Sequence, residues 1–262
     1  MIWETAFRSS DGCVSWQGEQ AQDSQELTEF LQGPVAARLN DEEGNQVLTE
    51  HLQGLSLTGM GQQALEEVLA AEVSETRDWA AGEALAEAVL EAEHEVVLPW
   101  NTERDKRNPF ASLPGADIVG FQHDGRSHRL ALGEVKCSSE AKSPPQVMSG
   151  RSGGMTHQLD ELTKSLSKIR TLLGWLLPRV KGTDHEPAFD EACTRYFNSQ
   201  CRDLVLFGVL VRDQAPRESD LKARGHQLAS HLEAPTRCCL IALYLPWPIG
   251  RLPQAIAQGG AA

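Results

Sequence analysis

Residues 115–136, GADIVGFQHDGRSHRLALGEVK, predict a β-hairpin around which the rest of the chain is arranged. Its two arms, residues 118–121 and 130–135, are rich in the branched and apolar side chains that favour strands. Asp124-Gly125 between the arms favours a tight turn, because glycine adopts positive φ without steric cost. The arms are therefore expected to pair antiparallel.

Three charged side chains converge if these strands pair. Asp117 can share a face with Val119 and Phe121 of the first strand, because side chains alternate between the faces of a strand. Glu134 and Lys136 share one face of the second strand for the same reason. A carboxylate pair attracts Mg²⁺, and a neighbouring lysine can orient or deprotonate an attacking water. This arrangement is typical of metal-dependent phosphodiesterases, although an ordinary hairpin with a solvated charged face explains the same spacing.

The composition predicts a protein of the reducing cytoplasm that has no membrane segment. The six cysteines form no C-x-x-C pair, which argues against a disulfide framework and against structural zinc. The N-terminus lacks the basic and apolar segments of a signal peptide. The longest apolar runs, residues 204–211 and 238–245, are too short to span a bilayer.

Charge is unevenly distributed along the 262 residues, whose net charge is −13. Residues 1–100 hold 3 Lys and Arg against 20 Asp and Glu, whereas residues 101–262 hold 21 against 17. The overall balance argues against a free-standing nucleic-acid binder, but the half that contains the hairpin is basic. The acidic half is either a solvated surface or a region that docks a basic partner or screens the basic site.

Residues 1–75 are expected to form an acidic N-terminal α+β extension, with residues 76–262 as the main domain. Its expected elements are two short strands at 2–7 and 13–16, a helix from Asp23 that Gly33-Pro34 interrupts, a polar loop at 41–45, a linker at 54–61 and a helix at 62–73.

Residues 77–95 predict a helix, because alanine, leucine and glutamate dominate there. Glu83 and Glu87 are four residues apart and lie on one helix face. Gly82 and the small alanines allow this helix to approach a sheet closely, which makes Glu83 a candidate site residue. A short strand is expected at 96–98.

Two basic loops flank the hairpin. The loop at 99–114 carries a compact cluster of cations, and the loop at 137–154, rich in Ser, Gly and Pro, is expected to be flexible. Near a metal site such side chains can hold phosphates, and elsewhere they are simply solvated. The candidate phosphate ligands are Arg104, Lys106, Arg107, Lys142 and Arg151.

The second half of the chain continues the alternation of strands and helices. Leucine and isoleucine recur at helical period through residues 156–177, and Gln158 lies in the first turn of this predicted helix. Strands are expected at 204–211 and 238–245, with a helix at 219–232 between them.

The chain resembles the PD-(D/E)XK superfamily, whose members have a restriction-endonuclease-like fold. The resemblance covers roughly residues 77–245. Its motifs, in order, match Gly82-Glu83 in the first helix, Asp117 before the first hairpin strand, Glu134-Val135-Lys136 in the second, and Gln158-Leu159 at the start of the next helix. The chain departs from the Pro-Asp form of the motif, since Pro114 precedes Asp117 by three residues.

The resemblance implies an α/β fold with a restriction-endonuclease-like core, in which helices flank a central mixed sheet. It also implies a catalytic set of Glu83, Asp117, Glu134, Lys136 and Gln158. Asp117, Glu134, the Val135 carbonyl and, directly or through water, Glu83 would bind Mg²⁺, with Mn²⁺ as a substitute. Lys136 would orient the attacking water, and Gln158 would hydrogen-bond the lysine or the DNA backbone.

The implied function is that of a metal-dependent DNA endonuclease. The style of the motif and the acidic N-terminal region resemble nuclease subunits of bacterial anti-phage systems of the Hachiman type, which implies DNA as substrate and a helicase or other ATPase as partner. Two alternatives stay open. One is a non-catalytic DNA-binding or assembly subunit on the same fold, and the other is a structure-specific repair nuclease or junction resolvase.

Overall fold

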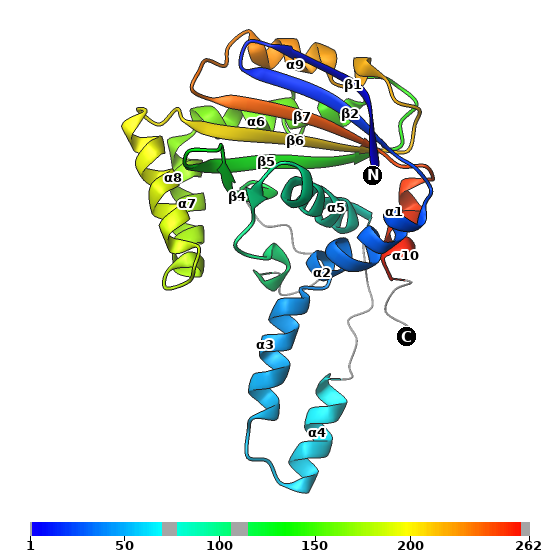
Figure 1. Ribbon diagram of the computed structural model, residues 1–262, viewed down its shortest axis with the longest axis vertical. Coiled ribbons are helices and arrows are strands. Elements are labelled where there is room, and N and C mark those ends of the chain that lie inside the picture. Colours follow the sequence, from blue (N-terminus) through cyan, green and yellow to red (C-terminus); the bar gives the residue numbers. More distant parts are fainter. Residues whose placement is uncertain (1, 70–77, 106–114, 258–262) are drawn as a thin grey trace.

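A computed structural model describes residues 2–69, 78–105 and 115–257 and confirms an α/β fold with a mixed sheet flanked by helices (Figure 1). The seven strands lie in the order β1-β2-β7-β6-β5-β4-β3. The central pairs β2–β7, β7–β6 and β6–β5 are parallel, whereas the outer pairs are antiparallel. The strands are β1 (Trp3–Asp11), β2 (Val14–Ala21), β3 (Val96–Val97), β4 (Ile118–His123), β5 (His128–Ser138), β6 (Leu204–Arg212) and β7 (Arg237–Tyr244).

Helices cover both faces of the sheet, as near-continuous apolar strands such as β6 require. The core on one face lies under α1 (Gln25–Phe30), the π-helical turn η1 (Leu31–Val35), α2 (Ala36–Leu39), α5 (Asp78–Glu93) and α10 (Leu252–Ala257). The core on the other face lies under α6 (Met155–Lys164), α7 (Leu166–Val180), α8 (Glu186–Asn198) and α9 (Lys222–Ala229). None of the described helices is both long enough and apolar enough to cross a membrane.

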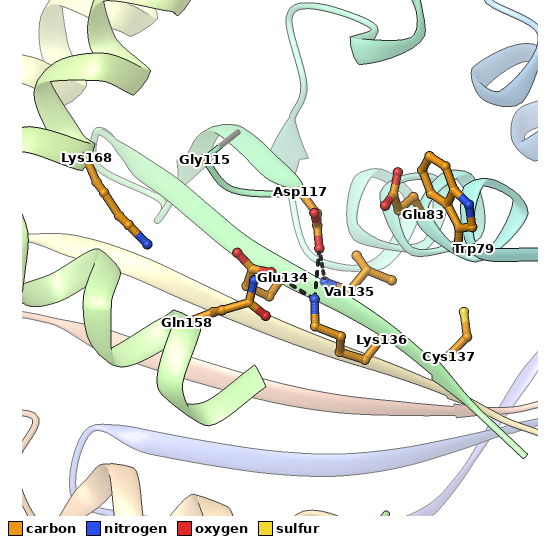
Figure 2. Close-up of a pocket in the computed structure, with 10 residues that line it drawn as sticks. All are labelled: Trp79, Glu83, Gly115, Asp117, Glu134, Val135, Lys136, Cys137, Gln158 and Lys168. Atoms are coloured by element: carbon orange, nitrogen blue, oxygen red, sulfur yellow. Dashed lines mark hydrogen bonds and ion pairs between the residues drawn. The ribbon is translucent and has the colours of Figure 1, made fainter. Parts of the chain in front are cut away.

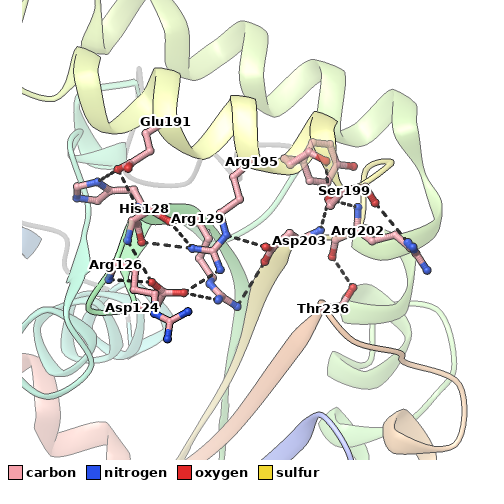
Figure 3. Close-up of polar contacts among 12 residues, drawn as sticks. Asp124, Arg126, His128, Arg129, Glu191, Arg195, Ser199, Arg202, Asp203 and Thr236 are labelled. Carbon is pink, nitrogen blue, oxygen red and sulfur yellow. Dashed lines mark hydrogen bonds and ion pairs between the residues drawn. The ribbon is translucent and has the colours of Figure 1, made fainter.

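The hairpin expected at 115–136 forms as β4 and β5, with register from Ile118 opposite Gly133 to His123 opposite His128. Its turn is held by ion pairs (Figure 3). The Asp124 carboxylate accepts hydrogen bonds from Arg129 at 2.6 Å and from Arg195 of α8 at 2.8 Å. Asp203, just before β6, accepts from Arg195 at 2.6 Å. These four charges join the turn to α8 and to the start of β6.

The first strands belong to the main sheet, so the expected division at residue 75 differs from the structure. β2 pairs with β7 from Val14 opposite Cys238 onward. Trp3 is buried in the core on one face, and Trp16 is buried in the core on the other. Of the described elements in this region, α3 (Glu42–Gln53) and α4 (Gly59–Leu69) project from the molecule as a helical hairpin (Figure 1).

Several helix boundaries differ from the sequence-based expectation. The polar segment at 41–45 begins α3, because the Asp41 side chain accepts a hydrogen bond from the Gly44 amide and caps the helix. Gly33-Pro34 does interrupt the first α-helix as expected, since both residues lie in the π-helical turn η1 between α1 and α2. The single helix expected at 156–177 is two helices, because Ser165 ends α6 and caps α7.

The beginning of the loop after β5 is anchored to the sheet. Arg212 at the end of β6 is fully buried and donates to the Ser138 carbonyl at 2.9 Å and to the Lys142 carbonyl at 3.3 Å. Its charge is opposed by Asp220, which is equally buried and lies 3.4 Å away. The expected flexible segment therefore starts from a fixed position beside the sheet.

Candidate active site

A cavity of about 590 Å³ lies at the edge of β5 between α5, α6 and α7 (Figure 2). Four elements and the segment before β4 contribute side chains to it. Its lining consists of Trp79, Glu83, Gly115, Asp117, Glu134, Val135, Lys136, Cys137, Gln158 and Lys168. Every residue of the predicted catalytic set is among them.

Lys136 lies between two carboxylates at the centre of this cavity. Its Nζ donates to Glu134 Oε2 at 3.1 Å and lies 3.7 Å from Asp117 Oδ2. The three side chains are largely buried, with exposed fractions of 1% for Glu134, 25% for Asp117 and 20% for Lys136. When both acids are ionised, two carboxylates and one ammonium give the cluster a net negative charge, which suits it to a cation.

The ends of the strands bring Asp117 to this position. β4 begins at Ile118, opposite Gly133, whereas β5 continues to Ser138. Asp117 is thus placed one residue beyond the paired strand, beside an edge of β5 that β4 no longer covers. The Val135 amide donates to Asp117 Oδ2 at 2.8 Å, so the side chain takes the place of a strand partner.

The surroundings of Glu134 disfavour the charged form of its carboxyl. Burial raises the pKa of its carboxyl, and the nearby Asp117 charge raises it further, while Lys136 acts in the opposite direction. A buried carboxylate close to a second one is stabilised in its charged form by a bound cation. The electrostatics of this pair therefore fit a metal site.

Gln158 reaches into the cavity from the first turn of α6 (Figure 2). The helix approaches the sheet closely at Gly208 of β6, where a Cβ atom would lie only 2.8 Å from Met155 of α6. Gln158 Oε1 is buried and has no hydrogen-bond partner among residues 2–69, 78–105 and 115–257. Because buried acceptors are nearly always paired, this atom points to a missing donor in the cavity.

Glu83 of α5 lines the cavity from the face of the sheet opposite to α6. A Cβ atom on Gly82 would lie 2.2 Å from the Cys137 sulfur, so only glycine lets the helix lie this close to β5, as the sequence predicts. Glu83 lines the cavity, whereas Glu87 is buried and lies 3.9 Å from Arg38 of α2. Glu83 is therefore the α5 carboxylate that faces the site.

The predicted phosphate ligands are not gathered at the cavity. Arg104 pairs with Asp41, at 2.8 Å, and with Glu43. Lys142 and Arg151 are exposed and do not line the cavity. Lys106 and Arg107 lie outside the described residues.

The cavity contains side chains that were not expected from the sequence. Lys168 lies in the segment that was expected to be one continuous helix, and the break at Ser165 gives it a position on a new helix, α7, from which it lines the cavity. Trp79 lies at the start of α5, is only partly buried and lines the cavity. Cys137 carried no sequence signal beyond its position next to Lys136.

The donor set fits Mg²⁺ better than a metal that needs many protein ligands. Among residues 2–69, 78–105 and 115–257, no group of three His, Cys, Asp or Glu side chains is arranged to hold a metal ion. Mg²⁺ is usually bound through one or two carboxylates and keeps several waters. Asp117 and Glu134 supply such a pair, and the adjacent backbone of Val135 supplies further oxygen.

Sequence comparisons add no relative to this description. No protein-family model matches the chain. No curated protein matches it either.

Proposed function

We propose that this protein is a Mg²⁺-dependent endodeoxyribonuclease with a restriction-endonuclease-like core. One observation carries the proposal: Lys136 lies between Asp117 and Glu134 at an uncovered strand edge inside a cavity. The α5 acid Glu83 and the α6 amide Gln158 line the same cavity, in the order and on the elements that this nuclease class uses.

Asp117, Glu134 and the Val135 carbonyl are the groups that would hold Mg²⁺, with Glu83 acting directly or through water. When bound, the ion supplies an acidic water and neutralises charge that develops on the phosphate. Mn²⁺ satisfies the same oxygen donors.

The chain's own side chains position the reactants. The Lys136 ammonium is held by two carboxylates, so its location is fixed before substrate enters. It orients the attacking water and offsets the negative charge that forms on the phosphate oxygens. The free acceptor Gln158 Oε1 receives a hydrogen bond from that water, from Lys136 or from the substrate.

DNA is the substrate that the charges favour. Lys168 lines the cavity, and the exposed Lys142 and Arg151 lie on the segment that joins β5 to α6. Such cations position a phosphate backbone without reading its sequence. The acidic first hundred residues support a nuclease that works as the effector subunit of a bacterial anti-phage complex of the Hachiman type, with a helicase or other ATPase as partner.

Plasmid nicking tests the assignment. Purified protein is incubated with supercoiled DNA and Mg²⁺ or Mn²⁺, alongside Glu134→Gln and Lys136→Met. Each variant should lose at least about 100-fold in nicking, because removal of a transition-state contact typically costs that much. Lys164→Met is the matched control, since Lys164 forms an exposed ion pair with Asp160 on α6. Equal nicking by wild type and both site variants contradicts the proposal.

A non-catalytic assembly subunit on the same fold is the second candidate. It is favoured by the positions of the predicted phosphate ligands, because Arg104, Lys142 and Arg151 do not line the cavity. DNA binding without metal-dependent cleavage by wild-type protein would support it. A junction resolvase is distinguished by a strong preference for branched DNA over linear duplex.

A further inference from the structure

The helical hairpin α3–α4 exposes an unusual amount of apolar surface. Met60 is 87% exposed and Val47 is 62% exposed. Six of the nine large apolar side chains that are exposed in the described chain belong to this hairpin and its connecting loop: Val47, Leu48, Leu55, Leu57, Met60 and Val68. Apolar side chains gathered in this way on a projecting element mark an interaction surface.

The chain itself does little to stabilise this hairpin. α3 has 12 residues and none is buried, and α4 has 11 residues of which only Leu65 is buried. Helices of this length are marginal in water unless they bury an apolar face. Among residues 2–69, 78–105 and 115–257, the hairpin thus lacks the buried partner surface that such helices normally have.

The negative charge of the hairpin indicates that a partner surface would be positively charged. Residues 39–69 contain six Asp and Glu and no Lys or Arg. DNA and anionic lipid are repelled by this charge, and a second copy of the hairpin would bring like charges together. A basic protein surface is attracted.

The base of the hairpin is fixed to the body of the protein. Asp41 caps α3 and also pairs with Arg104 at 2.8 Å. The Arg104 guanidinium lies over the Trp100 ring, 4.7 Å from its centroid. The hairpin therefore leaves the body from an anchored point, and its two helices extend away from the sheet (Figure 1).

We propose that α3–α4 is a docking arm for another protein, whose binding surface is an apolar groove bordered by Lys and Arg. The apolar side chains enter the groove, and the glutamates along both helices face the basic border. This inference does not depend on the site of Asp117 and Glu134, so it stands or falls separately from the nuclease proposal.

A pair of designed helical peptides tests the chemistry of the surface. Both carry the same leucine stripe, one bordered by lysine and the other by glutamate. Wild-type protein should bind the lysine peptide at least tenfold more tightly. Val47→Ser combined with Leu48→Ser and Met60→Ser should weaken that binding at least tenfold, whereas Leu166→Ser combined with Phe197→Ser, which removes exposed apolar side chains elsewhere, should not.

Charge reversal provides the second arm of the same experiment. Glu50→Lys combined with Glu66→Lys and Glu67→Lys should reverse the preference, so that the glutamate peptide binds more tightly. An unchanged preference in this variant, or undiminished binding by the serine variant, overturns the proposal.

Cross-linking in the cells that produce the protein tests the natural occupant. A photoreactive amino acid replaces Met60 in one variant and Phe197, which is 57% exposed, in the control. Adducts at Met60 should be several-fold more abundant, and the attached peptides should combine apolar residues with Lys or Arg. Equal adducts at both positions, peptides from a second copy of this chain, or peptides without basic residues overturn the proposal.

Discussion

Lys136 is the residue through which the candidate site is organised. Its contacts with Asp117 and Glu134 follow from alternation along β5 and from the point where β4 begins, and both are local features of the sequence. For this reason the central cluster could be predicted. Lys168 could not, because its position depends on how α7 packs after the break at Ser165.

Gln158 should affect activity without supporting the fold. Gln158→Leu removes a buried acceptor that has no partner in the described part of the chain, so the free energy of unfolding should stay equal or rise. Nicking should fall about tenfold, as is typical when a supporting group of a metal site is lost. Urea denaturation and plasmid nicking measure the two effects.

His157→Leu is the control for that variant, because His157 is the neighbouring residue and forms only a long 3.7 Å contact with Glu161. Comparable loss of nicking in both variants would assign the effect to α6 in general. Unchanged nicking in Gln158→Leu would remove Gln158 from the site.

Glycine should be needed at position 82 because Cys137 of β5 lies against it, and not because α5 itself favours glycine there. Gly82→Ala should destabilise the fold by about 1–3 kcal/mol, because the new methyl overlaps the Cys137 sulfur. In combination with Cys137→Ala the loss should be recovered, since alanine otherwise favours a helix over glycine by about 1 kcal/mol. Thermal or urea unfolding of the two single variants and the double variant checks this, and additive losses would contradict it.

Among the helices and strands, the sequence predicts a pairing between strands that are neighbours in the chain. It does not predict a pairing between strands that are far apart in the chain. The turn at Asp124-Gly125 and the alternation beside it predict the β4–β5 hairpin with its register. The helix at 41–45 was missed because its capping contact comes from Asp41, a residue type that also favours loops. Nothing local to β2 indicates that its neighbour is β7.

The ion pairs at the hairpin turn should make the free energy of unfolding decrease at acid pH. Hydrogen bonds from Arg195, and further ones from Arg129, hold the pKa of Asp124 well below its usual range. A carboxyl with a lowered pKa stabilises the fold above its unfolded pKa of about 3.9, and this contribution is lost as the pH falls below that value. Asp124→Asn should therefore cost about 3 kcal/mol at pH 7 and progressively less below pH ~4.

Urea unfolding of wild type and Asp124→Asn at neutral and acid pH measures this difference. Glu191→Gln is the control, since Glu191 pairs with His128 but is 44% exposed and should show a much smaller effect. A destabilisation of Asp124→Asn that is constant across the pH range would contradict the assignment.

At the scale of the whole molecule, the first 75 residues contain two parts with different roles. Replacing residues 42–69 by a short Gly-Ser linker should leave the thermal midpoint within a few degrees of wild type, because the removed hairpin buries almost nothing. Deleting residues 3–21 should prevent folding, because it removes Trp3 and Trp16 from the two cores and uncovers the edge of β7.

Calorimetry and solubility measurements distinguish the two deletions. A folded, soluble protein without residues 3–21 would restore the division into an N-terminal extension and a separate domain. The negative charge of this region suggested such a division, but charge reports on partners rather than on which strands pair.

The pairing of β2 with β7 also sets an order of events during synthesis. Val14 emerges from the ribosome roughly 224 residues before its partner Cys238, which at 5–20 residues per second is a delay of about 10–45 s. During that interval the N-terminal hairpin has an open edge and Trp16 lacks its final surroundings. The nascent chain is thus most exposed to aggregation at the β1–β2 hairpin. A chaperone that binds nascent strands would act on this hairpin first.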